Sequence, residues 1–122
     1  MDSAYDLFQS GTQLLERRDF HAATVPLARV RALEPDKSSV REALGRAYFG
    51  AQRYAEAAGE FEAVVARTPT DDYALFCLGR SLQQLGRHAE ARVPLTLAAT
   101  LRPERADYRL YRERAQQRAE AA

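Results

Sequence analysis

The sequence predicts an all-α solenoid of three helix–turn–helix units and a terminal capping helix, about seven helices in all. The first observation is a repeat with a fixed period, in which Gly11, Gly45 and Gly79 occupy one column. Five further columns keep this spacing: Leu14, Tyr48 and Leu82; Phe20, Tyr54 and His88; Ala23, Ala57 and Ala91; Leu27, Phe61 and Leu95; and Pro35, Pro69 and Pro103. The second observation is that apolar residues within each unit recur at helical spacing, whereas no run alternates with a period of two. A fixed period between roughly 20 and 50 residues indicates units that stack on one another.

The units span about residues 4–37, 38–71 and 72–105, and the middle one shows their plan. Ser38 and Ser39 offer capping hydroxyls, and Glu42 lies three residues after Ser39, as in a capping box. Two apolar stripes follow, on either side of a short connection at 52–54: Val40, Leu44, Ala47, Tyr48 and Ala51, then Ala57, Ala58, Phe61, Val64 and Val65. Pro69 ends the second helix, because the residue before a proline disfavours helical geometry.

Small residues stand where the two helices of a unit are expected to cross closely. The packing gained at such a crossing outweighs the ~1 kcal/mol by which each glycine of the Gly11, Gly45 and Gly79 column destabilises its helix. Pro26 and Pro94 share a column inside the second helices of the outer units, and each removes a backbone hydrogen bond. We therefore expect kinks there, and a straighter helix in the middle unit, which has Glu60 in that column.

The repeat ends in a helix over about residues 105–120. A fourth copy would carry polar residues in its main columns: Arg109, Arg112, Glu113 and Gln116. One apolar stripe nevertheless persists at helical spacing: Tyr108, Tyr111, Ala115 and Ala119. Because a solenoid needs a terminal element with a polar outer face, this segment is expected to cap the third unit. We expect residues 1–122 to form a single domain.

These columns resemble the tetratricopeptide repeat, a helix–turn–helix family with the same period. The resemblance covers about residues 4–103 and rests on matching residues in each unit: Leu7, Gly11, Leu14, Ala23, Leu27, Val30 and Pro35; Leu44, Gly45, Tyr48, Ala57, Phe61, Val64 and Pro69; Leu75, Leu78, Gly79, Leu82, Ala91, Leu95, Ala98 and Pro103. Ser10 and Arg41 depart from the family's bulky residues. The resemblance implies a right-handed superhelix whose first helices line a concave groove for extended peptides or partner helices.

The composition excludes several other classes of protein. The formal net charge is +1, which argues against general attraction to nucleic acid or anionic membranes. No stretch approaches the roughly 18 apolar residues of a membrane span, and the polar start shows no secretory signal. The single cysteine permits no internal disulfide, so we expect a cytoplasmic protein.

The residues that catalysis or metal binding needs are not grouped in the sequence. His21 and His88 share one repeat position two units apart, too far to hold one metal ion, and Cys77 has no sequence partner. The acidic residues, such as Glu56 and Glu60, are interpreted as a solvated face. The sequence therefore predicts no enzyme, no cofactor and no metal.

The resemblance assigns a partner-binding groove to the first helices of the units and to the cap. Its expected residues are Tyr5, Phe8, Thr12, Glu42, Arg46, Phe49, Tyr73, Phe76, Arg80 and Arg114. Arg46, Arg80 and Arg114 are each one repeat period apart, which predicts a row of guanidinium groups. Aromatic and arginine side chains are typical of binding hot spots, although they also occur as ordinary helix-surface residues.

The leading hypothesis is an adaptor or scaffold that binds a peptide or helix of another protein. The alternative is a self-associating structural module. A third hypothesis is nucleic-acid binding through the row of arginines and the basic residues of 105–118, and it is weakened by the balanced net charge and the interspersed acids. Family members that bind acidic chaperone tails use lysine, asparagine and arginine side chains as a clamp. The matching positions here hold Phe8, Thr12, Ala43, Tyr73 and Cys77, so we expect no such clamp.

Overall fold

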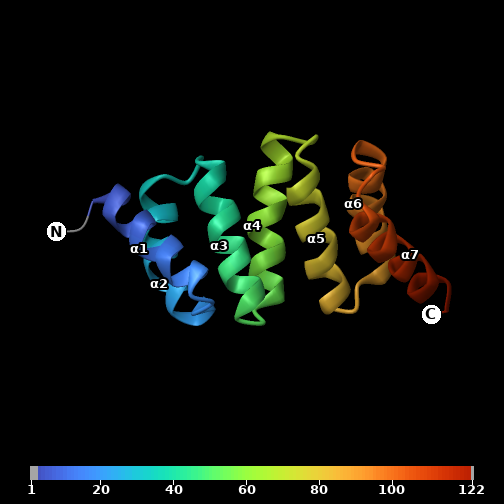
Figure 1. Cartoon of the computed structure of the whole chain (residues 1–122), viewed down its shortest axis with the longest axis horizontal. Coiled ribbons are helices and arrows are strands. Elements are labelled where there is room, and N and C mark those ends of the chain that lie inside the picture. Colours follow the sequence, from blue (N-terminus) through green and yellow to red (C-terminus); the bar gives the residue numbers. More distant parts are fainter. Residues whose placement is uncertain (1–2, 122) are drawn as a thin grey trace.

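The computed structural model describes residues 3–121, which form seven helices and no strand. The helices are α1 (Ala4–Glu16), α2 (Phe20–Leu33), α3 (Ser38–Gly50), α4 (Tyr54–Arg67), α5 (Asp72–Gln84), α6 (His88–Leu101) and α7 (Ala106–Ala121). They follow one another along the long axis of the molecule, as Figure 1 shows. Each packs against its sequence neighbours, and α1 also contacts α3 while α5 contacts α7. The predicted all-α solenoid is confirmed.

The column glycines lie where the two helices of a unit cross closely, as the sequence predicts. A Cβ atom placed on Gly11 would lie 2.5 Å from Leu27 Cγ, and one on Gly45 would lie 2.8 Å from Phe61 Cζ. A Cβ atom on Gly79 would likewise meet Leu95, at 2.6 Å from its Cδ2 atom. In each unit the glycine therefore makes room for a large residue of the second helix, and these residues are buried: Leu27, Phe61 and Leu95.

The turns between the two helices of each unit share a feature that the columns do not reveal. Arg18, Gln52 and Gly86 occupy equivalent positions in the three units, and each has a positive φ, at 61°, 63° and 76° respectively. The following N–H group donates to a carbonyl in the last turn of the preceding helix, from Asp19 to Leu14 and from Arg53 to Tyr48. This left-handed residue ends the first helix and redirects the chain into the second.

The capping box predicted at Ser39 and Glu42 is wrong. Helix α3 begins at Ser38 with Lys37 as its N-cap residue, and no side chain among the described residues caps it. Ser38 and Ser39 already lie within the first turn, where a hydroxyl cannot reach the free N–H groups ahead of it. The true capping positions are 3, 37 and 71, where Ser3 accepts from the Asp6 N–H and Asp71 from the Ala74 N–H.

Pro26 and Pro94 lie inside α2 and α6, and both helices continue past them. Each of these helices has 14 residues, the same length as α4, which has no proline. The loss of one backbone hydrogen bond is therefore compatible with an unbroken helix, as expected for a proline whose helix is held by packing on both sides.

Glu60 corrects the interpretation of the acidic residues as a solvated face. Its side chain is buried, with a residue exposure of 5%, and accepts hydrogen bonds from Arg31 in α2 (2.6 Å) and Arg41 in α3 (3.1 Å). Arg41 also donates to the Pro35 carbonyl. Arg31 belongs to the first unit, whereas Arg41 and Glu60 belong to the second. This charged cluster therefore joins the first unit to the second.

The seventh helix closes the third unit through Tyr108. This side chain is fully buried and stacks on Phe76, with ring centroids 4.6 Å apart. Its hydroxyl donates to Asp72 Oδ2 at 2.7 Å, and burial raises the pKa of the phenol. Ala115 is also fully buried, whereas most of the other α7 side chains are exposed. The apolar stripe and polar outer face thus match those of a capping element.

Candidate functional site

Three hollows follow one another along the face formed by α1, α3, α5 and α7, and together they are called the groove below. The N-terminal hollow, about 300 Å³, lies between α1 and α3 and includes Phe8, Thr12 and Glu42. The central hollow, about 460 Å³, lies between α3 and α5, and the C-terminal hollow, about 360 Å³, lies between α5 and α7. Arg46 lines both of the first two hollows, and Arg80 lines both of the last two.

The groove brings together nine of the ten residues expected to bind a partner. They are Phe8, Thr12, Glu42, Arg46, Phe49, Tyr73, Phe76, Arg80 and Arg114. Tyr5 is the exception, because it lies in the first turn of α1 with 72% of its surface exposed and lines none of the three hollows. The helical register placed Tyr5 on the same side as Tyr73, but the hollow at Tyr73 is walled by α3, which has no counterpart beside Tyr5.

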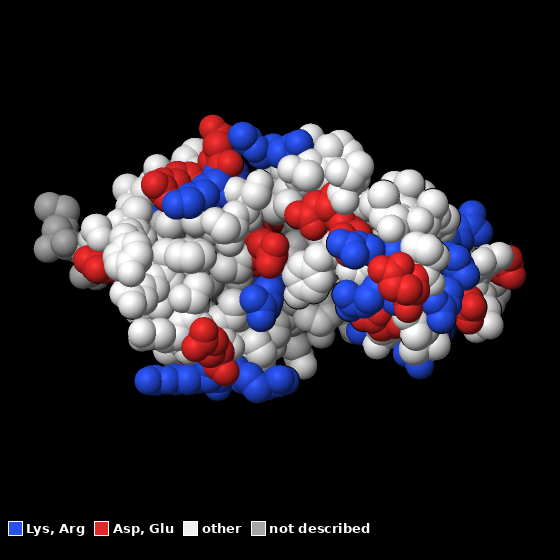
Figure 2. Space-filling model, turned by 45° about the horizontal axis from the view of Figure 1, so that its top comes forward, with Lys and Arg blue, Asp and Glu red and all other residues white. Residues whose placement is uncertain are grey.

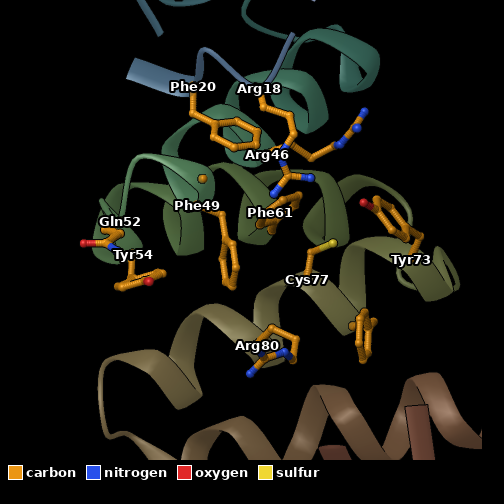
Figure 3. Close-up of a pocket in the computed structure, with 12 residues that line it drawn as sticks. Arg18, Phe20, Arg46, Phe49, Gln52, Tyr54, Phe61, Tyr73, Cys77 and Arg80 are labelled. Atoms are coloured by element: carbon orange, nitrogen blue, oxygen red, sulfur yellow. The ribbon is translucent and has the colours of Figure 1, made fainter. Parts of the chain in front are cut away.

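The central hollow combines aromatic rings with guanidinium groups. Figure 3 shows Phe49 between Arg46 and Arg80, with Cys77 facing the hollow from α5. Phe49 packs edge-on against Tyr54, with ring centroids 5.1 Å apart. Arg18, Arg46 and Arg80 contribute positive charge, and no carboxylate of residues 3–121 lines this hollow. Such a surface can bury an apolar side chain while offering directional hydrogen bonds at its edges.

The thiol and phenol of the central hollow are held in their neutral forms. Burial raises the pKa of the Cys77 thiol to about 12, and burial together with Cys77 raises the pKa of Tyr73. The thiolate that nucleophilic chemistry requires is therefore scarce at neutral pH. Within residues 3–121, no three histidine, cysteine or acidic side chains are grouped to hold a metal ion. Cys77 thus contributes packing surface to the groove.

The N-terminal hollow differs in charge because Glu16 and Glu42 line it together with Arg46. Burial raises the pKa of Glu42, and repulsion from Asp71 raises it further, while Arg46 acts in the opposite direction. Among the described residues, the groove therefore has acidic groups only at its α1 end. Its charge changes along its length, so that a bound chain would be recognised in one direction.

The sequence did not predict several groove residues that come from helix ends, from the middle of α4 and from the cap. In the central hollow these are Arg18, Phe20, Gly50, Gln52, Tyr54 and Phe61, and in the C-terminal hollow Gln84, Gly86, His88, Tyr111 and Arg118. Tyr111 could have been found, because it lies one repeat period after Cys77, which lines the central hollow. Extending the repeat register into the capping helix is the signal that identifies it.

A family model described as tetratricopeptide repeat matches residues 8–72 and 42–108. A comparison with curated proteins gave no match. Solved structures with the same fold include MamA (AMB-1), at 24% identity and TM-score 0.87, where the alignment covers 97% of this chain and 64% of that one. The first TPR of Spaghetti (RPAP3), bound to the HSP90 peptide SRMEEVD, matches at 18% identity and TM-score 0.87, over 98% of this chain and 94% of that one. The Sgt2 TPR domain from Aspergillus fumigatus matches at 14% identity and TM-score 0.84, over 98% and 81%.

The family assignment agrees with the fold. The matched segments together span residues 8–108, which include α2 to α6 and most of α1. The structural neighbours share the helical-repeat architecture over nearly the whole chain, which spans somewhat less than two thirds of the MamA chain. None of the seven helices is both long and apolar enough to cross a membrane. The chain therefore belongs to the tetratricopeptide repeat family.

Proposed function

We propose that this protein is a non-catalytic adaptor or scaffold that binds a peptide or helix of a partner protein in the groove. The observation that carries the proposal is the lining of the central hollow. Phe49 and Phe76 offer apolar surface there, and Arg46 makes no ion pair with any residue of 3–121. Partly exposed aromatic side chains and an arginine without an ion-pair partner are groups that contribute strongly to binding protein ligands.

The groove has the form that this function needs. Its three hollows are continuous through the shared Arg46 and Arg80, so an extended chain could place successive side chains in them. The RPAP3 neighbour is bound to a peptide, which supports a peptide ligand for the fold. The positions that form the chaperone-binding clamp in other family members hold Phe8, Thr12, Ala43, Tyr73 and Cys77 here, so we propose a different recognition mode. The units at 4–37, 38–71 and 72–105 and the cap at 105–120 would act as one domain, in the cytoplasm.

The test is capture from the source cell with three baits. The groove variant is Arg46→Ala with Arg80→Ala, and the matched control is Arg29→Ala with Arg92→Ala, two exposed helix arginines outside the groove. We expect a partner that the wild-type and control baits retain and the groove variant loses. Titration calorimetry with that partner, once purified, should show binding weakened about tenfold or more by the groove variant alone. If the partner bound all three baits with equal affinity, the groove would not be its binding site.

Self-association is the second candidate, and an exposed apolar stripe favours it. Val93, Leu97 and Leu101 lie one helical turn apart on α6, with 63%, 47% and 41% of their surfaces exposed. Val25 is similarly exposed on α2, in the same column as Val93. Light scattering at low and high protein concentration distinguishes the two candidates. A dimer that survives dilution and protects Phe76 would favour the structural module over the simple adaptor.

A further inference from the structure

The C-terminal hollow contains three arginines and no carboxylate from the described residues. Arg80 comes from α5, whereas Arg114 and Arg118 come from α7. None of them forms an ion pair with a residue of 3–121, although eight other arginines of the chain do. His88 also lines this hollow, and its Nδ1 atom is buried without a hydrogen-bond partner among the described residues. This wall therefore contains charge that the protein itself does not neutralise.

The guanidinium group of Arg80 is held in one orientation. It lies over the Tyr111 ring, with its Cζ atom 3.9 Å from the ring centroid, and its Nη1 donates to Gln83 Oε1 at 3.0 Å. Gln83 in turn donates from Nε2 to the Tyr111 carbonyl at 2.9 Å, which ties α5 to α7. Stacking occupies a face of the guanidinium group, and no hydrogen bond among residues 3–121 uses the N–H groups of its Nε–Nη2 edge. That edge is the one that pairs with a planar carboxylate through two hydrogen bonds.

Arg114 approaches the same tyrosine, with its Cζ atom 5.1 Å from the Tyr111 ring centroid. Tyr111 therefore lies beside two guanidinium groups, and both of them line the hollow. Like charges that line one hollow repel one another, and an anion bound there relieves that repulsion while accepting hydrogen bonds from the arginines. The side chains of the hollow are thus arranged to favour an anionic ligand before any ligand is present.

We infer that the C-terminal hollow is a carboxylate site, which receives an acidic side chain or the terminal carboxylate of the partner peptide. The inference deepens the proposed function and rests on it. The adjacent central hollow, lined by Phe49 and Phe76, takes an apolar side chain next to that acidic group in the peptide. Arg80 lines both hollows and sets the distance between the two subsites. None of the three arginines occupies a clamp position of the chaperone-binding members.

A peptide fits this surface better than a nucleic acid does. A polyanion that follows the groove past the central hollow meets Glu16 and Glu42 at the α1 end, which repel it. The face drawn in Figure 2 mixes basic and acidic side chains, and no continuous basic band crosses the part of it that the structure describes. A peptide that is acidic only where it meets α7 avoids this repulsion, so the distribution of charge in the groove selects that ligand.

The test is selection of binders from a random peptide library with free carboxyl termini. Wild-type protein should enrich peptides in which an acidic group adjoins an aromatic or aliphatic residue. Arg114→Gln with Arg118→Gln should lose the acidic preference and keep the apolar one. The control Arg29→Gln with Arg92→Gln carries the same net charge and should keep both preferences. Circular dichroism checks that all the variants are folded.

Fluorescence anisotropy with the most enriched peptide then measures the effect directly. Replacing the acidic groups of the peptide by amides should weaken binding about tenfold or more, and the Arg114 and Arg118 double variant should abolish that difference. Arg80→Lys keeps the charge but loses the stacked, forked geometry, so it should also weaken binding of the acidic peptide.

The outcomes separate the two proposals. Enrichment of apolar residues without acids on wild-type protein overturns the carboxylate site and leaves the groove function intact. Failure of the groove to enrich any peptide counts against both. Equal acidic preference in the Arg114 and Arg118 double variant places the carboxylate elsewhere and overturns the inference. Displacement of the peptide by a single-stranded uridine oligomer that binds more tightly assigns the hollow to nucleic acid instead.

Discussion

Replacing a glycine by alanine should have opposite effects at two glycines of this protein. Gly45 in α3 and Gly59 in α4 are both interior to helices, so alanine at either position gains about 1 kcal/mol of helix propensity. At Gly59 nothing lies within 4 Å of the new Cβ atom. We therefore expect Gly59→Ala to raise the free energy of unfolding by about 1 kcal/mol.

At Gly45 the new Cβ atom would lie 2.8 Å from Phe61 Cζ and 3.0 Å from both Cε atoms. The ring of Phe61 is 1% exposed and packs among buried neighbours, so it can yield to the new Cβ atom only by shifting toward the central hollow that it lines. Overpacking of this kind costs about 1–3 kcal/mol, so the middle of that range exceeds the gain in propensity by about 1 kcal/mol. Gly45→Ala should therefore destabilise the protein by about 1 kcal/mol, and Gly45→Leu should do so more severely.

Far-UV circular dichroism during thermal unfolding tests the contrast. A change of about 1 kcal/mol shifts the melting temperature of a domain of this size by roughly 4 °C, so the two alanine variants should differ by about 8 °C or more. A double-mutant cycle with Phe61→Ala identifies the cause, because the penalty at Gly45 should vanish when the ring is absent. A Gly45→Ala protein that melts at or above the wild-type temperature would refute the steric reasoning.

Three other changes test the remaining features. Glu60→Ala should cost about 1–3 kcal/mol, because it leaves Arg31 and Arg41 unpaired and partly buried, whereas the exposed Glu62→Ala should change stability by less than about 0.5 kcal/mol in urea titrations. Burial raises the folded-state pKa of Cys77 to about 12, from 9.0, so the stability it contributes is present below pH 9 and lost as the pH rises toward 12. That loss should be absent from a Cys77→Ala protein, and alkylation of the native thiol at pH 8 should be slow. Deletion of residues 104–122 uncovers Phe76 and Leu75, so the shortened chain should self-associate on gel filtration, and a stable monomer would argue against the cap.

Most of the fold could be predicted from the repeat columns, because each column residue makes the same kind of packing contact in every unit. Gly11, Gly45 and Gly79 need no further context once the large residue that each one faces in the second helix is noticed. The turn position could not be predicted in the same way. Arg18, Gln52 and Gly86 adopt one backbone geometry with three different side chains, so their column has no common residue type to reveal it.

Charge placement was the least predictable part of the structure. Glu60 looks like any surface glutamate of an amphipathic helix, and only the approach of Arg31 and Arg41 from two other helices accounts for its burial. The groove shows the same limit. The family resemblance placed the first-helix residues, but the position of Arg118 depends on how the cap lies against α5, which three-dimensional packing decides.

Because every helix packs mainly on its neighbours in the chain, folding requires few contacts between distant segments. Proteins with such low contact order fold quickly, and each unit can add to the one already formed. The cooperativity of unfolding between units then depends on the strength of the junctions that join them. The junction between the first two units contains the Glu60 cluster, whose attraction weakens with salt, whereas Tyr108 closes the other end with an aromatic stack. Ionic conditions thus act on whether the first unit unfolds with the rest of the chain or ahead of it.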